Sequence, residues 1–139
     1  MLSPKAEAFA KLYYEEIRHF STDVQRIAEN LGKNEEDIRR IKAYLFEDDA
    51  LFDEFTGTWR RFDPDCAIAQ SWQRLVLGED IKPHDRTLIE HELLEMDIKR
   101  NNPGISHGEA HEQAAKKYNY PKEVKDYYGS LKKHQKDGE

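Results

Sequence analysis

The stretch that decides the fold is residues 81–120, IKPHDRTLIEHELLEMDIKRNNPGISHGEAHEQAAKKYNY, which holds four of the six histidines. Its first part predicts a helix over residues 83–100, with proline at the first helical position, and the run NNPG at 101–104 ends that helix. The motif SHGE at 106–109 is a capping box and predicts a second helix over residues 107–118. So short a turn makes the two helices an antiparallel hairpin.

The histidines of this hairpin lie on faces predicted to point inward. At about 100° per residue, His84, His91 and Glu95 fall within an arc of about 40°. On the second helix, His107 and His111 share one face. His91 and Glu95 are one turn apart, about 6 Å along the axis. Since His111 should lie level with Glu95 and His107 nearer the turn, we expect these four to converge. His84, about 10 Å along the axis from His91, falls outside the set, as a more distant partner.

This set of side chains is typical of a metal-assisted hydrolase. Imidazole and carboxylate groups one helical turn apart are common zinc ligands, which predicts a zinc site of His91, Glu95 and His111, with His107 next. The segment HELLE at 91–95 resembles the zinc-protease motif H-E-x-x-H with its last ligand changed to Glu. The acid after the first histidine is the general base of that motif, a role that falls here to Glu92. The candidate catalytic residues are therefore His91, Glu92, Glu95 and His111.

Two other uses of this cluster stay open at the level of sequence. A nuclease can use histidine for proton transfer while a metal ion or arginine stabilises phosphate charge. The histidines can also be buried and inert, with Glu95 paired to one of them or to Arg74. The sequence does not decide whether the chain is an enzyme.

The rest of the chain predicts an all-α fold, because glycine and proline are scarce and no β-type alternation is sustained. We expect a single compact multi-helix domain within residues 1–139. Its parts are an N-terminal helix (1–20), a helix-turn-helix-like pair (21–46), helices carrying the His/Glu site (58–120), and a short helix with a frayed tail (121–139). The acidic run at 47–57 predicts a loop or short helix held by its aromatic residues. The next segment, Trp59-Arg60-Arg61, is expected to be a packed tryptophan with solvated arginines, with binding of an anion or a base as the alternative. It leads into a helix capped by Asp63, with Pro64 in its first turn.

The pair at residues 21–46 has the spacing of a DNA-binding helix-turn-helix. Its second helix opens with Asn34-Glu35-Glu36-Asp37, where a recognition helix should meet phosphates. These acids would repel a duplex, so the pattern favours a structural helical corner over a DNA-binding regulator.

Composition excludes several other classes of protein. The formal charge of −6 disfavours non-specific coating of nucleic acid. The single cysteine, Cys66, excludes an internal disulfide and indicates a buried small residue. No apolar run approaches the roughly 20 residues of a membrane helix. We therefore expect no membrane partner, and a cytoplasmic protein or a domain delivered as part of a larger protein.

Four blocks of the chain, spread from about residue 21 to 120, carry a resemblance to known families. They are DVQRIAENLGKNEEDIRRIKAYLF, RRFDPD with SWQRLVLGEDI, PHDRTLIEHELLE and GEAHEQAAKKYNYP. In order and spacing they resemble helical C-terminal domains of phage minor head proteins and bacterial polymorphic toxins. The resemblance implies an all-α effector module, often carried on a larger protein and met by a protein inhibitor. By position the resemblance falls on eight residues. Four of them are candidate catalytic residues of the site, namely His91, Glu92, Glu95 and His111. The other four are outer positions that would support the site, namely Trp72, His84, Asp85 and Tyr118.

Two functions follow as rival expectations. The first is a phage- or toxin-related effector that acts as a metal-assisted or acid–base hydrolase, with nucleic acid as the expected substrate. The second is a non-catalytic interaction module of a phage or mobile element, in which the His/Glu cluster is structural.

Overall fold

Helix α5 (Pro83–Asn101) is the longest helix, and other helices pack along its length. The computed structural model describes residues 3–137, with side chains described as far as Leu131. The other helices are α1 (Pro4–His19), α2 (Asp23–Leu31), α3 (Glu35–Lys42), α4 (Cys66–Leu77), α6 (His107–Lys117) and α7 (Tyr120–Asp137). A π-helical turn, η1 (Ala43–Glu47), and the strands β1 (Leu51–Asp53) and β2 (Thr58–Arg60) lie between α3 and α4. The prediction of an all-α fold is confirmed, with one small hairpin of strands added.

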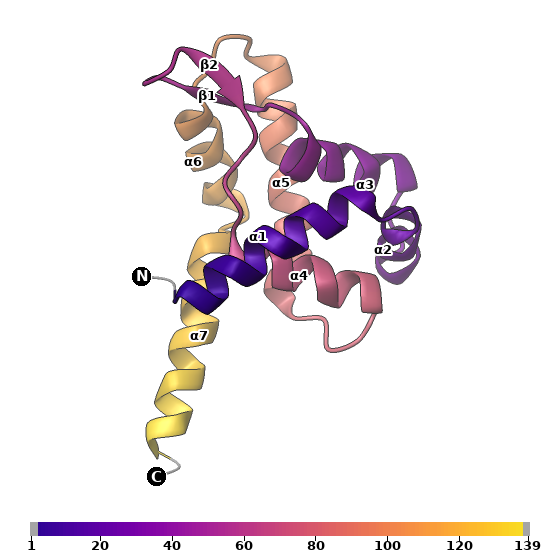
Figure 1. The fold of residues 1–139 in the computed structure, drawn as a ribbon, viewed down its shortest axis with the longest axis vertical. Coiled ribbons are helices and arrows are strands. Elements are labelled where there is room, and N and C mark those ends of the chain that lie inside the picture. Colours follow the sequence, from indigo (N-terminus) through magenta and orange to yellow (C-terminus); the bar gives the residue numbers. More distant parts are fainter. Residues whose placement is uncertain (1–2, 138–139) are drawn as a thin grey trace.

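The predicted C-terminal hairpin is the pair α5 and α6, which run antiparallel side by side (Figure 1). Gly104, at φ 92°, lies in the turn between them, in a left-handed conformation that glycine adopts without strain. Ser106 begins α6, because its side chain accepts a hydrogen bond from the backbone N–H of Glu109 at 3.1 Å.

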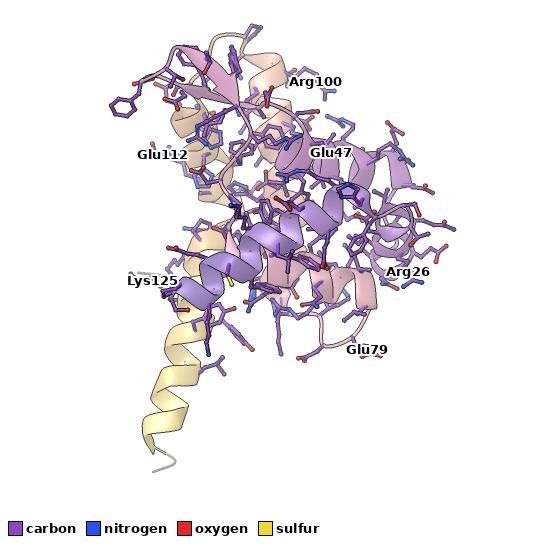
Figure 2. The ribbon with its side chains drawn as sticks, in the orientation of Figure 1. Arg26, Glu47, Glu79, Arg100, Glu112 and Lys125 are labelled. Carbon is purple, nitrogen blue, oxygen red and sulfur yellow. The ribbon has the colours of Figure 1, made fainter. Side chains whose placement is uncertain are left out.

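Helices α1 to α4 build the main hydrophobic core against α5. The side chains of Tyr14, Phe46 and Trp72 are fully buried, and their rings meet edge to face at centroid distances of 4.8 and 5.0 Å. Side chains fill the space between these helices, while charged residues such as Arg26 and Glu79 lie at the periphery (Figure 2). No helix within residues 3–137 combines the length and the apolar character needed to cross a bilayer.

The helix-turn-helix-like pair is built into this core. α2 and α3 pack together, and α3 also packs on α5. Ile38 and Ile41 of α3 are fully buried. The first turn of α3 carries the three predicted acids, Glu35, Glu36 and Asp37.

The segment from residue 47 to 65 differs from its prediction. In place of a loop or short helix, β1 and β2 form an antiparallel hairpin with Phe52 opposite Trp59. The expectation of a packed Trp59 is wrong, since 62% of this residue is exposed. Asp65, and not Asp63, caps α4, because Arg60 holds Asp63 at 3.0 Å while the Asp65 carboxylate accepts from the N–H of Ile68 at 2.9 Å.

The structure also defines the end of the third helix and the extent of the last one. The helix predicted to continue through Phe46 widens at η1, where the N–H of Asp48 donates to the carbonyl of Ala43 at 2.7 Å, a π-type bond. The last helix, α7, covers residues 120–137 of the segment predicted as a short helix and a frayed tail, and residues 138 and 139 of that tail lie outside the described residues.

Candidate metal centre

Three side chains from α5 and α6 converge where the hairpin model predicts. His91 and Glu95 project from the same face of α5, and His111 lies one turn into α6 from its capped start. His91 Nε2 lies 3.3 Å from Glu95 Oε1 and 3.2 Å from His111 Nδ1, and His111 Nδ1 lies 3.1 Å from Glu95 Oε1. Within the described part of the chain, this trio is the group that could hold a metal ion.

The spacing of the three atoms matches a tetrahedral metal. Ligand atoms bound to zinc at about 2.0 Å lie about 3.3 Å from one another along the edges of a tetrahedron. The triangle of 3.1, 3.2 and 3.3 Å therefore needs little movement to receive such an ion. A fourth position would be left for water or substrate, as in catalytic zinc sites.

Neighbouring groups orient the two buried members of the trio, His91 and Glu95. The Tyr118 backbone carbonyl, an obligate acceptor, takes the Nδ1–H of His91 at 2.8 Å. This bond fixes the ring so that Nε2 faces Glu95 and His111, which is the usual outer support of a metal-bound histidine. The hydroxyl of Tyr44 donates to the second carboxylate oxygen of Glu95, which leaves Oε1 for the centre.

The charges at the centre favour one added positive charge. Burial by itself would raise the pKa of Glu95, but hydrogen bonds from His91 and Tyr44 and the nearby histidines outweigh it and lower that pKa to about 2. Burial would likewise lower the pKa of His91, but the Glu95 and Tyr118 hydrogen bonds and the negative charge of Glu92 and Glu95 raise it. A proton on His91 and a metal ion are alternative ways to supply that charge.

Glu92 is a second buried carboxylate beside the trio. It is 6% exposed, and its Oε2 is the one buried side-chain oxygen or nitrogen in the described residues without a hydrogen-bond partner. Burial and the charge of Glu95 raise its pKa to about 8, whereas a divalent cation held by the trio would lower it and favour the ionised form. Glu92, Glu95 and His111 all line a cavity of about 250 Å³. An unpartnered carboxylate facing a cavity has the free lone pairs that a general base requires.

His107, the fourth predicted ligand, lies at the edge of the centre. Its Nδ1 is 3.8 Å from Glu95 Oε2 and accepts a hydrogen bond from Lys99 Nζ at 3.0 Å. Burial lowers the pKa of both His107 and Lys99, although the charge of Glu95 opposes the shift. The trio that could hold a metal does not include His107.

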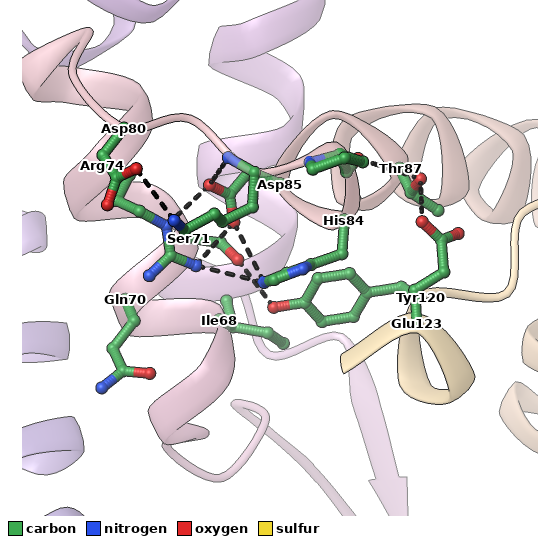
Figure 3. Close-up of polar contacts among 12 residues, drawn as sticks. Ile68, Gln70, Ser71, Arg74, Asp80, His84, Asp85, Thr87, Tyr120 and Glu123 are labelled. Atoms are coloured by element: carbon green, nitrogen blue, oxygen red, sulfur yellow. Dashed lines mark hydrogen bonds and ion pairs between the residues drawn. The ribbon is translucent and has the colours of Figure 1, made fainter. Parts of the chain in front are cut away.

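The other predicted outer residues lie elsewhere, except Tyr118, which acts through its carbonyl group. His84 and Asp85 form a separate cluster with Arg74, shown in Figure 3. Both carboxylate oxygens of Asp85 accept from the Arg74 guanidinium at 2.7 Å. Trp72 donates its indole N–H to Asp23 at 3.1 Å, within the core. The alternative in which Arg74 pairs with Glu95 is therefore wrong.

Tyr44 and Lys99 are the functional candidates that sequence reasoning missed. Tyr44 lies 51 positions from Glu95 along the chain, and the π-helical turn that carries it has no periodic signal. Lys99 is one turn from Glu95 on α5, a spacing that could have pointed to it.

Comparison with models of known protein families, with curated proteins and with solved structures finds no match.

Proposed function

We propose that the chain is a metal-dependent hydrolase, with zinc held by His91, Glu95 and His111 and with Glu92 as general base. The observation that carries the proposal is the triangle of ligand atoms, 3.1 to 3.3 Å on each side, beside an unpartnered buried carboxylate. A zinc ion lowers the pKa of a bound water to about 7, within reach of a neighbouring carboxylate.

In the proposed reaction, Glu92 accepts one proton and later donates it. As the water oxygen attacks the electrophilic centre of the substrate, the Glu92 carboxylate accepts the water proton. The same carboxyl group then gives that proton to the leaving oxygen as its bond to the substrate breaks. Glu92 returns to the ionised form, so the residue is regenerated with each turnover.

We further propose an effector role, which the sequence resemblance to phage and toxin domains implies. We propose a phosphodiester as the substrate class, because nucleases use histidine for proton transfer and a metal ion to stabilise phosphate charge. The non-catalytic interaction module is the rival. In that case the cluster would bind no metal ion and the protein would hydrolyse nothing.

The test joins zinc analysis to hydrolysis of bis(4-nitrophenyl) phosphate. We expect the wild type to bind one zinc and to lose hydrolysis in chelator. Glu92→Gln should keep the zinc and lose at least about 100-fold in rate, as general-base loss does. Glu90→Gln is the matched control, because Glu90 lies on the same helix and pairs with Lys33. Absence of zinc binding, or an unchanged rate in Glu92→Gln, contradicts the proposal.

The effector role has its own measurement. We expect wild-type expression to arrest bacterial growth, and Glu92→Gln expression at the same level to permit it. Equal growth with both forms would contradict the effector role. The hydrolase proposal would then be decided by zinc binding and phosphodiester hydrolysis alone.

A further inference from the structure

The β1–β2 hairpin carries two partly exposed aromatic side chains, Phe52 and Trp59. Phe52 and Trp59 are 45% and 62% exposed, although they face each other across the strands with ring centroids 5.4 Å apart. Directly opposed residues of an antiparallel pair share one face of the hairpin. The two rings therefore form a single aromatic platform, which we call the Phe52–Trp59 platform.

This platform is one wall of a groove beside the candidate metal centre. The groove has a volume of about 810 Å³ and is closed on the other side by the α5–α6 turn and the start of α6. Figure 1 shows the hairpin at the same end of the molecule as that turn. His107 and Leu51 line both the groove and the cavity that contains Glu92, so the two spaces adjoin.

A positive charge lies where the two spaces meet. Lys99 lines the groove, donates to His107 at 3.0 Å and lies 4.8 Å from the centroid of the Tyr44 ring. Ser106, at the start of α6, lines the same region, where the helix dipole adds a partial positive charge. An anionic group in the groove beside Lys99 would thus be attracted by the ammonium group and by the start of α6.

We propose that the groove binds single-stranded nucleic acid, with an unpaired base on the Phe52–Trp59 platform and the adjoining phosphodiester at Lys99. The inference rests on the proposed hydrolase and names its substrate class. Aromatic rings that stack bases beside a cation are the usual elements of single-strand recognition, and a paired base cannot reach such a platform. Glu54 on the groove wall and the net charge of −6 disfavour a duplex, whose affinity depends on many phosphate contacts.

The experiment measures binding without zinc, so that it does not depend on hydrolysis. Fluorescein-labelled hexathymidylate, hexauridylate and a hexamer duplex are titrated with chelated protein and followed by fluorescence anisotropy. We expect both single strands to bind more tightly than the duplex, and thymidine monophosphate to compete weakly. The ratio of the Kd values for hexathymidylate and hexauridylate tells whether the natural ligand is DNA or RNA.

Three variants locate the binding site. Trp59→Ala and Lys99→Gln should each weaken single-strand binding by about 10-fold, within the range measured for loss of one stacking or charged contact. Phe55→Ala is the matched control, because Phe55 is fully exposed on the same hairpin and does not line the groove. Circular dichroism of each variant checks that the helices are retained. In Phe52→Ala, quenching of tryptophan emission by hexathymidylate should also weaken. This readout reports on the platform, because Trp72, the other tryptophan, is fully buried.

The outcomes separate this inference from the proposed function. Zinc-dependent hydrolysis of the small phosphodiester without single-strand binding overturns the groove assignment and leaves the hydrolase. Single-strand binding that needs Trp59 and Lys99, without zinc-dependent hydrolysis, supports the groove and contradicts the hydrolase. Equal binding by wild type and Trp59→Ala, or displacement of the oligonucleotide by an apolar peptide at lower concentration than by an unlabelled strand, overturns the inference.

Discussion

The two polar clusters of α5 use the same residue types for opposite purposes. Near the start of the helix, Asp85 meets Arg74 through two 2.7 Å hydrogen bonds, with His84 beside them. One anion meets one cation there, and the backbone N–H of Lys82 also donates to Asp85 at 2.8 Å. In the middle of the helix, Glu92 and Glu95 lie beside histidines and a cavity, and one carboxylate oxygen of the described residues has no partner. The first cluster is a closed ion pair, whereas the second lines a cavity and has one unpartnered carboxylate oxygen, on Glu92, among the described residues.

Breaking the closed pair should have the largest effect on stability. Arg74→Ala leaves the fully buried carboxylate of Asp85 without its cation. We expect the free energy of unfolding to fall by about 3 kcal/mol, the lower end for a broken buried pair. Urea denaturation measures the loss. Adding Asp85→Asn should recover part of it, since the buried charge is then gone. The exposed Arg86 gives the control, Arg86→Ala, which should change stability by less than about 0.5 kcal/mol. An equal loss in both single variants would show that the pair is not the cause.

Breaking the open cluster should change metal binding and leave the fold nearly unchanged. The His111 side chain is 43% exposed, so we expect His111→Ala to cost less than about 1 kcal/mol without zinc. Zinc at 100 times its Kd should stabilise the wild type by about 2.7 kcal/mol, and this increment should vanish in the variant. Thermal denaturation with and without zinc measures both quantities. His19→Ala, at another exposed histidine, is the control. Full zinc stabilisation of His111→Ala would exclude His111 as a ligand.

Removing the group that orients Glu95 should have a smaller effect. Tyr44→Phe deletes the hydroxyl that donates to Glu95 and keeps the ring, which packs edge to face on Phe62 at 5.2 Å. We expect zinc affinity to fall about 10-fold, as for other outer partners of metal ligands. A competition titration with a chromogenic chelator measures the Kd. Tyr128→Phe, which removes a hydroxyl bonded to Gln70, should leave the Kd unchanged. A shift of the same size in both variants would argue against a specific role of Tyr44.

The smallest effect expected is the pH dependence that His84 adds to the closed cluster. Burial lowers its pKa in the folded state, and the positive charge of Arg74 and Lys82 adds to this, while the negative charge of Asp85 and Glu123 opposes it. The unfolded chain, with a histidine pKa of about 6.5, then binds more protons than the folded chain. Stability should therefore be full above about pH 6.5 and fall as the pH drops below it.

This pH dependence is measured by urea denaturation at pH 7.5 and pH 5.5. His84→Asn removes the titrating ring, so we expect a smaller difference between the two pH values than in the wild type. The groups that face His84, which are Arg74, Lys82, Asp85 and Glu123, are unchanged in this variant. An unchanged difference would assign the acid-side loss to other residues.

The sequence alone determined the hairpin and the meeting of His91, Glu95 and His111. Two capped helices joined by a tight turn have a fixed rise per residue, so His111 had to lie level with Glu95. Hydrophobic periodicity also predicted the all-α class, because apolar residues at helical spacing indicate helices with one buried face. The same reasoning put His84 outside the set, where the structure places it.

Contacts between segments far apart in the chain were decided only by the tertiary structure. Tyr44 reaches Glu95 from a π-helical turn, the hairpin forms the groove wall, and Trp72 bonds to Asp23 in the core. No local pattern encodes these contacts, because they depend on how rigid elements pack once the core is formed. Helical periodicity fixes the position of a residue along its own axis, whereas the partner that it meets is fixed by the packing of the whole chain.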